Sequence, residues 1–333
     1  MRKCICSLLF LLVTVVAANA ATTIKIATIA PEGSSWMRQM RSAAGQVKAQ
    51  TDGRVRLKFY GGGVMGNEKS VLRKIRVGQL HGAALTGSGL SAISPGAVVY
   101  SLPLLTASVE QMNCLRQKMD KEIAARLLKR GFVSFGFASG GYANLMSKMP
   151  IHNAAEMKGL KVWVPEGDRV GYAVLEALGL APVTLPLSDV LTGLQTGLVD
   201  IVGTSPLGAL AFQWYTQLHY ITRLPLVYVY GALVIDKRVM ARLSPADGKV
   251  VRAVLEQMYR NFDQQNLVDD EQALAVLQHE GLQMVEPTSG EYARWNTVAQ
   301  QVIKRMVTDG VLDGALYQRV QARLHACRSV VGQ

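Results

Sequence analysis

The sequence is poor in cysteine and histidine, and beyond residue 20 it has no apolar run long enough to cross a bilayer. Among 333 residues there are four cysteines and five histidines, and the histidines share no i,i+4 spacing. Apart from His325 beside Cys327, no histidine has a cysteine nearby, so the pattern does not indicate a metal site. We expect neither a metal nor any other cofactor, and a soluble chain after residue 20.

The sequence also lacks a recognisable catalytic arrangement. Ser205 is followed by proline and has no second glycine two positions on, so a G-x-S-x-G nucleophile turn is absent. Glu32, Glu68 and Glu166 could each face a cleft, but a solvated surface position is the default for a single carboxylate. We therefore expect a protein that is not an enzyme.

Acidic residues are fewer than basic residues, 24 against 36, and the formal net charge is +12. A positive balance suits nucleic acid, a membrane surface or acidic ligands. Here the basic residues are scattered, and no run interleaves them with aromatic side chains that could stack on bases. We interpret the basic residues as lying on solvated faces of helices and strands, and we expect no nucleic-acid partner.

Residues 1–20 have the features of a cleavable secretory signal. Met1-Arg2-Lys3 is basic, residues 5–16 are apolar, and Ala18-Asn19-Ala20 offers a small-residue cleavage site. Arg2 and Lys3 are the only charged residues of that segment, so the remainder carries +10 of the +12. The sequence therefore predicts a periplasmic protein that begins near residue 21.

Two of the four cysteines lie in the predicted signal, which leaves Cys114 and Cys327. In an oxidising compartment two thiols often pair. Both lie in helical patterns, and free buried cysteine is also common, so the sequence leaves a disulfide and two free thiols open.

The sequence predicts the same order of elements twice, which indicates an α/β fold. In the first half we expect strands at 22–29, 55–59 and 83–85 with helices from Ser34 or Ser35 and from Asn67. In the second half we expect strands at 161–164, 182–185 and 199–202. Asp168 and Ser188 are the predicted caps of the helices between those strands.

A short repeat supports two lobes of similar build. Val71-Leu72-x-x-Ile75-x-x-Gly78 matches Val190-Leu191-x-x-Leu194-x-x-Gly197, and an apolar strand follows each. We expect lobe I at 21–140 plus 229–268 and lobe II at 141–228 plus 269–333, each with its own sheet. Segments 132–138 and 226–236 are the predicted crossings, with a turn at 139–141. Ligands of such folds bind beyond the carboxyl ends of the strands, here between the lobes.

Further helices are predicted at 109–130, at 245–265 and at 291–307.

The segment 158–165 reads KGLKVWVP, and 194–200 reads LQTGLVD. With their spacing, these motifs resemble the substrate-receptor subunit of TRAP (tripartite ATP-independent periplasmic) transporters, the DctP-like family, over about residues 22–330. The resemblance implies a two-lobed, type II-like periplasmic-binding-protein fold with the ligand cleft between the lobes. It also implies a monomeric receptor that delivers a small molecule to membrane permease subunits.

Two positions depart from the family in a way that bears on the ligand. Trp163 stands where the family usually has the arginine that binds a substrate carboxylate, and Ala143 stands where some members have a second arginine. A buried carboxylate without a guanidinium partner loses a charge-assisted bond while its desolvation cost remains. We therefore expect a ligand that is apolar or aromatic, or only weakly anionic.

We expect the ligand contacts to come from both lobes and from the crossing. The candidates are Trp163, Ser205, Trp214 and Tyr215 from lobe II, Glu32, Trp36, Asn67 and Ser88 from lobe I, and Tyr142 from the crossing.

Three alternatives stay open. Trp163 could pack inside its own lobe while Lys69 or Arg73 holds a small organic acid. Trp36 and Trp214 could belong to the core. The protein could also be a periplasmic ligand sensor that feeds a membrane receptor instead of a transporter.

Overall fold

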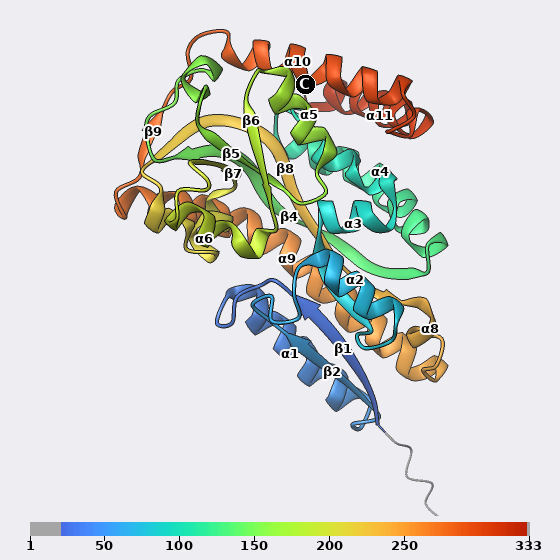
Figure 1. Cartoon of the computed structure of the whole chain (residues 1–333). Coiled ribbons are helices and arrows are strands. Elements are labelled where there is room, and N and C mark those ends of the chain that lie inside the picture. Colours follow the sequence, from blue (N-terminus) through green and yellow to red (C-terminus); the bar gives the residue numbers. More distant parts are fainter. Residues whose placement is uncertain (1–20, 332–333) are drawn as a thin grey trace, which may run out of the picture.

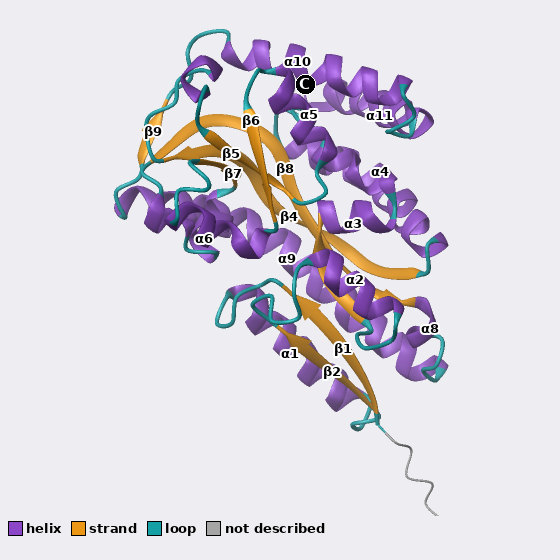
Figure 2. Ribbon diagram, in the orientation of Figure 1, coloured by secondary structure: helices purple, strands orange, loops and turns teal. Residues whose placement is uncertain are grey.

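The computed structural model of the chain describes residues 21–331, with side chains described as far as residue 327. The predicted secretory signal over residues 1–20 lies outside the described residues. Within them the fold is mixed α/β, as predicted, with helices on both faces of a central sheet (Figures 1 and 2).

The strands fall into two short groups and one long pair. They are β1 (Thr22–Thr28), β2 (Val55–Tyr60), β3 (Gly82–Thr86), β4 (Phe132–Ser147), β5 (Lys161–Pro165), β6 (Ala181–Leu185), β7 (Ile201–Thr204), β8 (Tyr220–Asp236) and β9 (Gln283–Val285). Their order in the sheet is β2-β1-β3-β8-β4-β7-β5-β6, with β9 paired to β8.

Each predicted β-α-β-α-β array forms one end of this sheet. We call β1, β2 and β3 the first strand group and β5, β6 and β7 the second strand group; within each, the paired strands are parallel. The expectation of two separate sheets is wrong, because β4 and β8 pair with each other and connect both groups. These strands are 16 and 17 residues long; β8 pairs with β3 of the first group, and β4 pairs with β7 of the second.

The turn predicted at residues 139–141 is also wrong, since β4 runs through it. The chain changes register against β8 between Ser139 and Tyr142 instead of reversing. Gly141 has a φ of 82°, and a Cβ built there would lie 2.4 Å from the Asp270 carboxylate. Glycine therefore supplies a bulge within a strand, where the sequence alone suggested a turn.

Helices cover the two faces of the sheet. The α-helices are α1 (Ser35–Gln50), α2 (Glu68–Arg76), α3 (Gly87–Ile93), α4 (Val109–Lys129), α5 (Arg169–Ala177), α6 (Val190–Gln195), α7 (Pro206–Ala211), α8 (Lys237–Met240), α9 (Pro245–His279), α10 (Glu291–Thr308) and α11 (Gly314–Val331). Short 3₁₀ turns are η1 (Pro95–Ser101), η2 (Ala154–Met157), η3 (Leu187–Asp189) and η4 (Trp214–Gln217). No helix within residues 21–331 is both long and apolar enough to cross a membrane.

Most predicted helix starts are confirmed by cap hydrogen bonds. The side chains of Ser34, Asn67 and Asp168 accept backbone N–H groups at the starts of α1, α2 and α5. Ser188 is not a cap: its hydroxyl donates to Asp189, and η3 intervenes before α6. The helix predicted at 245–265 continues to His279 as α9, which spans 35 residues.

The apolar core has three parts. One joins α1, β1 and β2 to α9, with Ile24, Met37 and Leu255 fully buried. A second lies beneath the second strand group around Trp163 and Trp214. The largest contains α4, α5, α10 and α11 and includes side chains near both strand groups. In Figure 1, α1 and β2 lie at the lower end of the molecule, and α10 and α11 lie at the upper end.

Candidate ligand-binding site

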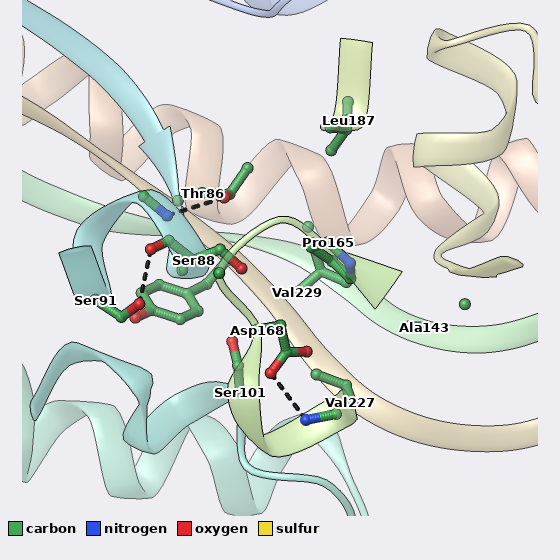
Figure 3. A pocket seen from close by; sticks show the side chains of 18 of the residues that line it. Thr86, Ser88, Ser91, Ser101, Ala143, Pro165, Asp168, Leu187, Val227 and Val229 are labelled. Carbon is green, nitrogen blue, oxygen red and sulfur yellow. Dashed lines mark hydrogen bonds between the residues drawn. The ribbon is translucent and has the colours of Figure 1, made fainter. Parts of the chain in front are cut away.

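A cavity of about 850 Å³ lies between the two strand groups, against the middle of β4 and β8. Its lining includes the last residues of four strands: Thr28 of β1, Thr86 of β3, Pro165 of β5 and Thr204 of β7. The carboxyl ends of both strand groups therefore meet at one space, where α/β proteins place their ligands. In Figure 3, the segment carrying Thr86 and Ser88 comes from one group and the segment carrying Pro165 and Asp168 from the other.

The structure brings six of the nine predicted contact residues to this cavity. They are Trp36, Asn67, Ser88, Trp163, Ser205 and Trp214. Ala143 also lines it.

The other three predicted residues are not in the lining and have partners elsewhere. Glu32 accepts from Arg41 at 2.7 Å, and both side chains are more than half exposed. The Tyr142 hydroxyl donates to the backbone oxygen of Ser108 at 2.9 Å, at the start of α4. Tyr215 packs against the core around Trp214. None of these three side chains lines the cavity.

Trp163 is largely packed within the second strand group, although part of it lines the cavity. Its indole N–H donates to the backbone oxygen of Leu185 at 3.0 Å, and its ring meets Trp214 edge-on with centroids 5.2 Å apart. Only 5% of the residue is exposed. The side chain therefore forms a wall of the site held in one orientation.

Trp36, predicted as a ligand contact with a core position left open, lines the cavity. Its indole N–H donates to the Asn266 side chain at 3.0 Å, and Asn266 in turn donates to the Ser139 backbone oxygen at 2.7 Å. This chain of bonds connects α1, α9 and β4 at the cavity wall. Trp36 also contacts Phe212, which follows α7, with ring centroids 6.2 Å apart.

A second contact joins the two strand groups across the cavity. The Asn67 amide, at the start of α2, donates to the Glu166 carboxylate at 3.0 Å. Glu166 lies in the loop between β5 and α5. With the Trp36–Phe212 contact, this bond holds the two sides of the site together.

Three carboxylates in the lining, those of Glu68, Glu166 and Asp168, were not predicted as contacts. Glu68 accepts from the N–H and the hydroxyl of Thr86 at 2.6 and 2.9 Å, and removal from water raises the pKa of its carboxyl. Asp168 accepts from the Gly171 N–H at 2.9 Å, and burial likewise raises its pKa (Figure 3). Asp168 was recognised only as a helix cap. Its position directly after a strand end was the available signal that it reaches the site.

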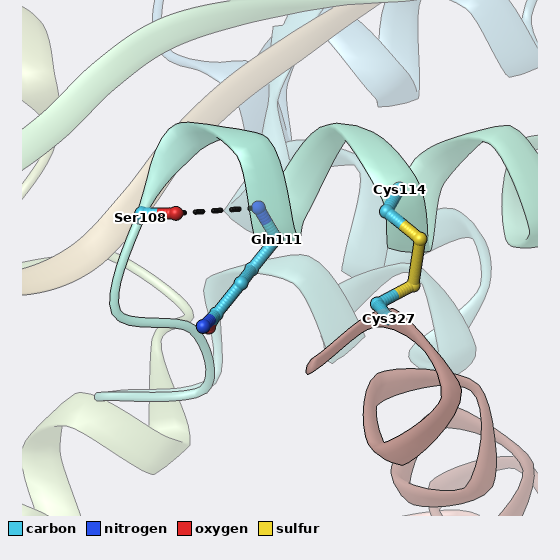
Figure 4. Close-up of a disulfide and its surroundings, with 4 residues drawn as sticks. All are labelled: Ser108, Gln111, Cys114 and Cys327. Atoms are coloured by element: carbon cyan, nitrogen blue, oxygen red, sulfur yellow. Dashed lines mark hydrogen bonds between the residues drawn. A yellow bond between two sulfur atoms is a disulfide. The ribbon is translucent and has the colours of Figure 1, made fainter. Parts of the chain in front are cut away.

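Cys114 and Cys327, left open by the sequence, form a disulfide with Cα atoms 5.9 Å apart. The bond connects α4 to α11, far apart in the sequence but side by side in the fold (Figure 4). It lies outside the cavity lining and fixes helices behind the site.

The fold and the cavity between two strand groups define a solute-binding protein of the two-lobed class. Residues 26–309 match the family model described as bacterial extracellular solute-binding protein, family 7. The chain belongs to this family, named DctP, which confirms the resemblance drawn from the sequence.

Individual relatives are distant. The chain is 25% identical over 287 residues to a solute-binding protein of Roseobacter denitrificans, a match that covers 82% of this chain and 86% of the relative. It is 24% identical over 221 residues to YiiZ of Salmonella typhimurium, described as uncharacterized, covering 63% of this chain and 65% of the relative.

The fold itself is closely shared with solved structures. A TRAP periplasmic solute-binding protein from Xanthobacter autotrophicus, solved with bound β-D-galacturonate, superposes with a TM-score of 0.82. The two chains are 21% identical, and the match covers 90% of this chain and 99% of the other.

Proposed function

We propose that this protein is the extracytoplasmic receptor of a TRAP transporter. It binds one small molecule in the cavity between its two lobes and delivers that molecule to the permease subunits in the membrane. It catalyses no reaction itself. The lobe boundaries predicted from the sequence, 21–140 plus 229–268 and 141–228 plus 269–333, belong to this proposal. Each internal boundary falls inside β4, β8 or α9, so those elements form the hinge.

We further propose that the ligand is apolar or aromatic, or weakly anionic. The observation that carries this is the combination of Trp163 and Ala143 in the cavity wall. Neither side chain can pair with a carboxylate, and most of the remaining lining is apolar. A simple carboxylate that entered the cavity would lose its hydrogen bonds to water and would find no bidentate partner in their place.

The alternative is a small organic acid held by unusual contacts. The similar protein from Xanthobacter autotrophicus has a sugar acid bound. Of the two basic residues considered from the sequence, Lys69 at the start of α2 lines the cavity and Arg73 does not; Arg169 at the start of α5 is a second basic side chain of the described lining. Lys69 and Arg169 are both exposed, so pairing with either would be weaker than a buried arginine clamp.

A melting screen tests the proposal. Succinate, galacturonate and sialic acid are compared at millimolar concentration with aromatic and aliphatic compounds. A ligand at about a hundred times its dissociation constant adds about 2.7 kcal/mol to stability, so a binder stands out clearly. We expect the simple carboxylates to give little stabilisation, and Trp163→Phe to weaken a genuine ligand by about 1–3 kcal/mol.

The alternative would be established if a small acid gave strong stabilisation. That stabilisation would have to be lost in Lys69→Gln or Arg169→Gln and retained in Trp163→Phe. Lys158→Gln is the matched control, because Lys158 is exposed and lies outside the lining. A neighbouring gene pair for small and large permease subunits would favour transport, and reconstituting uptake in vesicles with those subunits tests delivery separately. Ligand binding without uptake would favour the sensor alternative.

A further inference from the structure

The lining of the cavity includes a set of apolar side chains from α5, η1 and α10. Val174 on α5, Val98 on η1, and Ala299 and Met306 on α10 belong to this set. Leu312, between α10 and α11, is also part of the lining. We call the part of the cavity bounded by these five side chains the α5–α10 branch.

Charged side chains of the described lining are confined to two segments. They are Glu68 and Lys69 at the start of α2, and Glu166, Asp168 and Arg169 around the start of α5. None comes from η1 or α10. The indole N–H of Trp295, on the α10 side, is already bonded to Glu291 at 2.8 Å. The cavity therefore has one polar region and one apolar region.

The walls of the α5–α10 branch are fixed by packing behind them. A Cβ on Gly96 of η1 would lie 2.8 Å from the Leu316 side chain of α11, so these two elements are in close contact. The disulfide between Cys114 and Cys327 holds α11 against α4. Preformed walls of this kind lower the ordering cost of binding.

The volume also exceeds what a compact solute needs. At about 30 Å³ for each water molecule, a cavity of 850 Å³ would hold roughly 28 of them. A sugar acid has about half that number of non-hydrogen atoms, so it would fill only part of the cavity.

We propose that the α5–α10 branch holds an unbranched alkyl chain, so that the ligand is an amphiphile. Its polar head lies near Ser88 and Asp168, and its tail lies between α5, η1 and α10. This inference rests on the proposed receptor function and specifies its substrate class. Burial of each methylene group in the branch supplies the affinity that the missing arginines do not.

The test is a chain-length series on purified, delipidated protein. Straight-chain fatty acids and the matching alcohols, from about four to about sixteen carbons, are titrated and their dissociation constants measured. Each added methylene should tighten binding about fourfold until the branch is full, after which the affinity should level off.

Variants that fill the branch provide the structural control. Val98→Phe should weaken the longest probes at least tenfold and shift the plateau to shorter chains, while leaving the shortest probes unchanged. Val268→Phe is the matched control, since Val268 is an exposed valine on α9 outside the lining. If Val98→Phe does not fold, Leu312→Phe fills the branch from its other side.

Two results would overturn the inference. The first is an affinity that does not depend on chain length. The second is an equal effect of Val98→Phe and Val268→Phe on the affinity for the longest probes. If a compact ligand from the melting screen binds while the chain series fails, only the amphiphile inference is lost. If no compound binds in either experiment, the receptor function fails with it.

Discussion

At the scale of single residues, Trp163 and Asp168 are both held in the cavity wall by hydrogen bonds to nearby backbone groups. Trp163 lies between Val162 and Val164 on β5, and alternation places it on the opposite face from both. Because both faces of this sheet are buried, alternation alone could not say which face borders the cavity. The cap at Asp168 was predictable, since it depends on local backbone bonds. Its exposure to the ligand space depends on where the first strand group lies.

Asp270 on α9 is the residue whose titration should be visible in stability. It accepts from the Leu207 N–H at 2.8 Å, and burial raises its pKa from 3.8 to about 6. A raised pKa means that the folded protein holds this proton more tightly than the unfolded chain does. Its contribution to stability is therefore complete below pH 3.8 and is lost as the pH rises through about 6.

Asp270→Asn removes the titration and keeps an oxygen that can accept from Leu207. Relative to this variant, the native protein should lose about 3 kcal/mol of stability between about pH 4 and about pH 7. Urea unfolding of both proteins across that range measures the difference in stability. The other titrating groups contribute equally to both proteins, so their effects cancel in that difference. A constant difference across the range would contradict the prediction.

At the scale of elements, Arg116 on α4 forms a buried junction between α4, β4, β8 and α9. Its guanidinium donates to Asp263 at 2.6 Å, to the Phe137 backbone oxygen at 2.8 Å and to the Tyr228 hydroxyl at 3.0 Å. Asp263 also accepts from the Ser139 N–H at 2.8 Å, beside the register change in β4. Arg116→Met should cost about 3–5 kcal/mol, because it leaves these acceptors and Asp263 without their cation.

Arg41→Met is the matched control for Arg116→Met. Arg41 also makes a short ion pair, with Glu32, but its side chain is 56% exposed against 6% for Arg116. The exposed pair should contribute about 0–1 kcal/mol. Urea unfolding measures the loss of stability in both variants. Similar losses would show that burial does not increase the contribution of the Arg116 junction to stability.

The disulfide is a second link between elements. Cys114 and Cys327 are 213 positions apart, and closing so long a loop stabilises by roughly 5 kcal/mol in the chain-entropy model. The Cys114→Ser, Cys327→Ser double variant should lose stability on that scale, and reducing agent should affect only the native protein. Titration of denatured, unreduced protein checks the bond directly. Two free thiols per chain would refute it.

Element prediction was most accurate where local signals act alone. The helices over Val109–Lys129 and Glu291–Thr308 match their predicted ranges closely, because apolar periodicity is a local signal; Ser108 also caps the first, whereas Gly290 gives the second no side-chain cap. Gly141 was misread because glycine permits a turn and a bulge equally. Its role depends on Asp270, which approaches from α9 and is distant in sequence. The extension of α9 to His279 likewise follows from packing against β4 and α7, which no local pattern reveals.

At the scale of the whole molecule, β4, β8 and α9 each cross a proposed lobe boundary, so the proposed lobes are connected by three continuous elements. We propose that closure bends these three elements. The contacts across the cavity then determine how stable the closed form is. Asn67 and Glu166 supply the hydrogen bond between the strand groups, and Trp36 and Phe212 supply the ring contact. Under the proposed receptor function the permease recognises the closed form, so we expect these contacts to affect delivery as well as affinity.

Asn67→Ser tests this coupling without disturbing the fold. Serine keeps the cap that Asn67 provides to α2, but it is too short to reach Glu166. The melting temperature of the ligand-free protein should change little, while ligand affinity should fall about two- to tenfold, as one net hydrogen bond predicts. Glu166→Ala should cause a similar loss, and the double variant should lose no more than either single variant. Additive losses in that cycle would mean that the two residues act separately and that their bond does not stabilise closure.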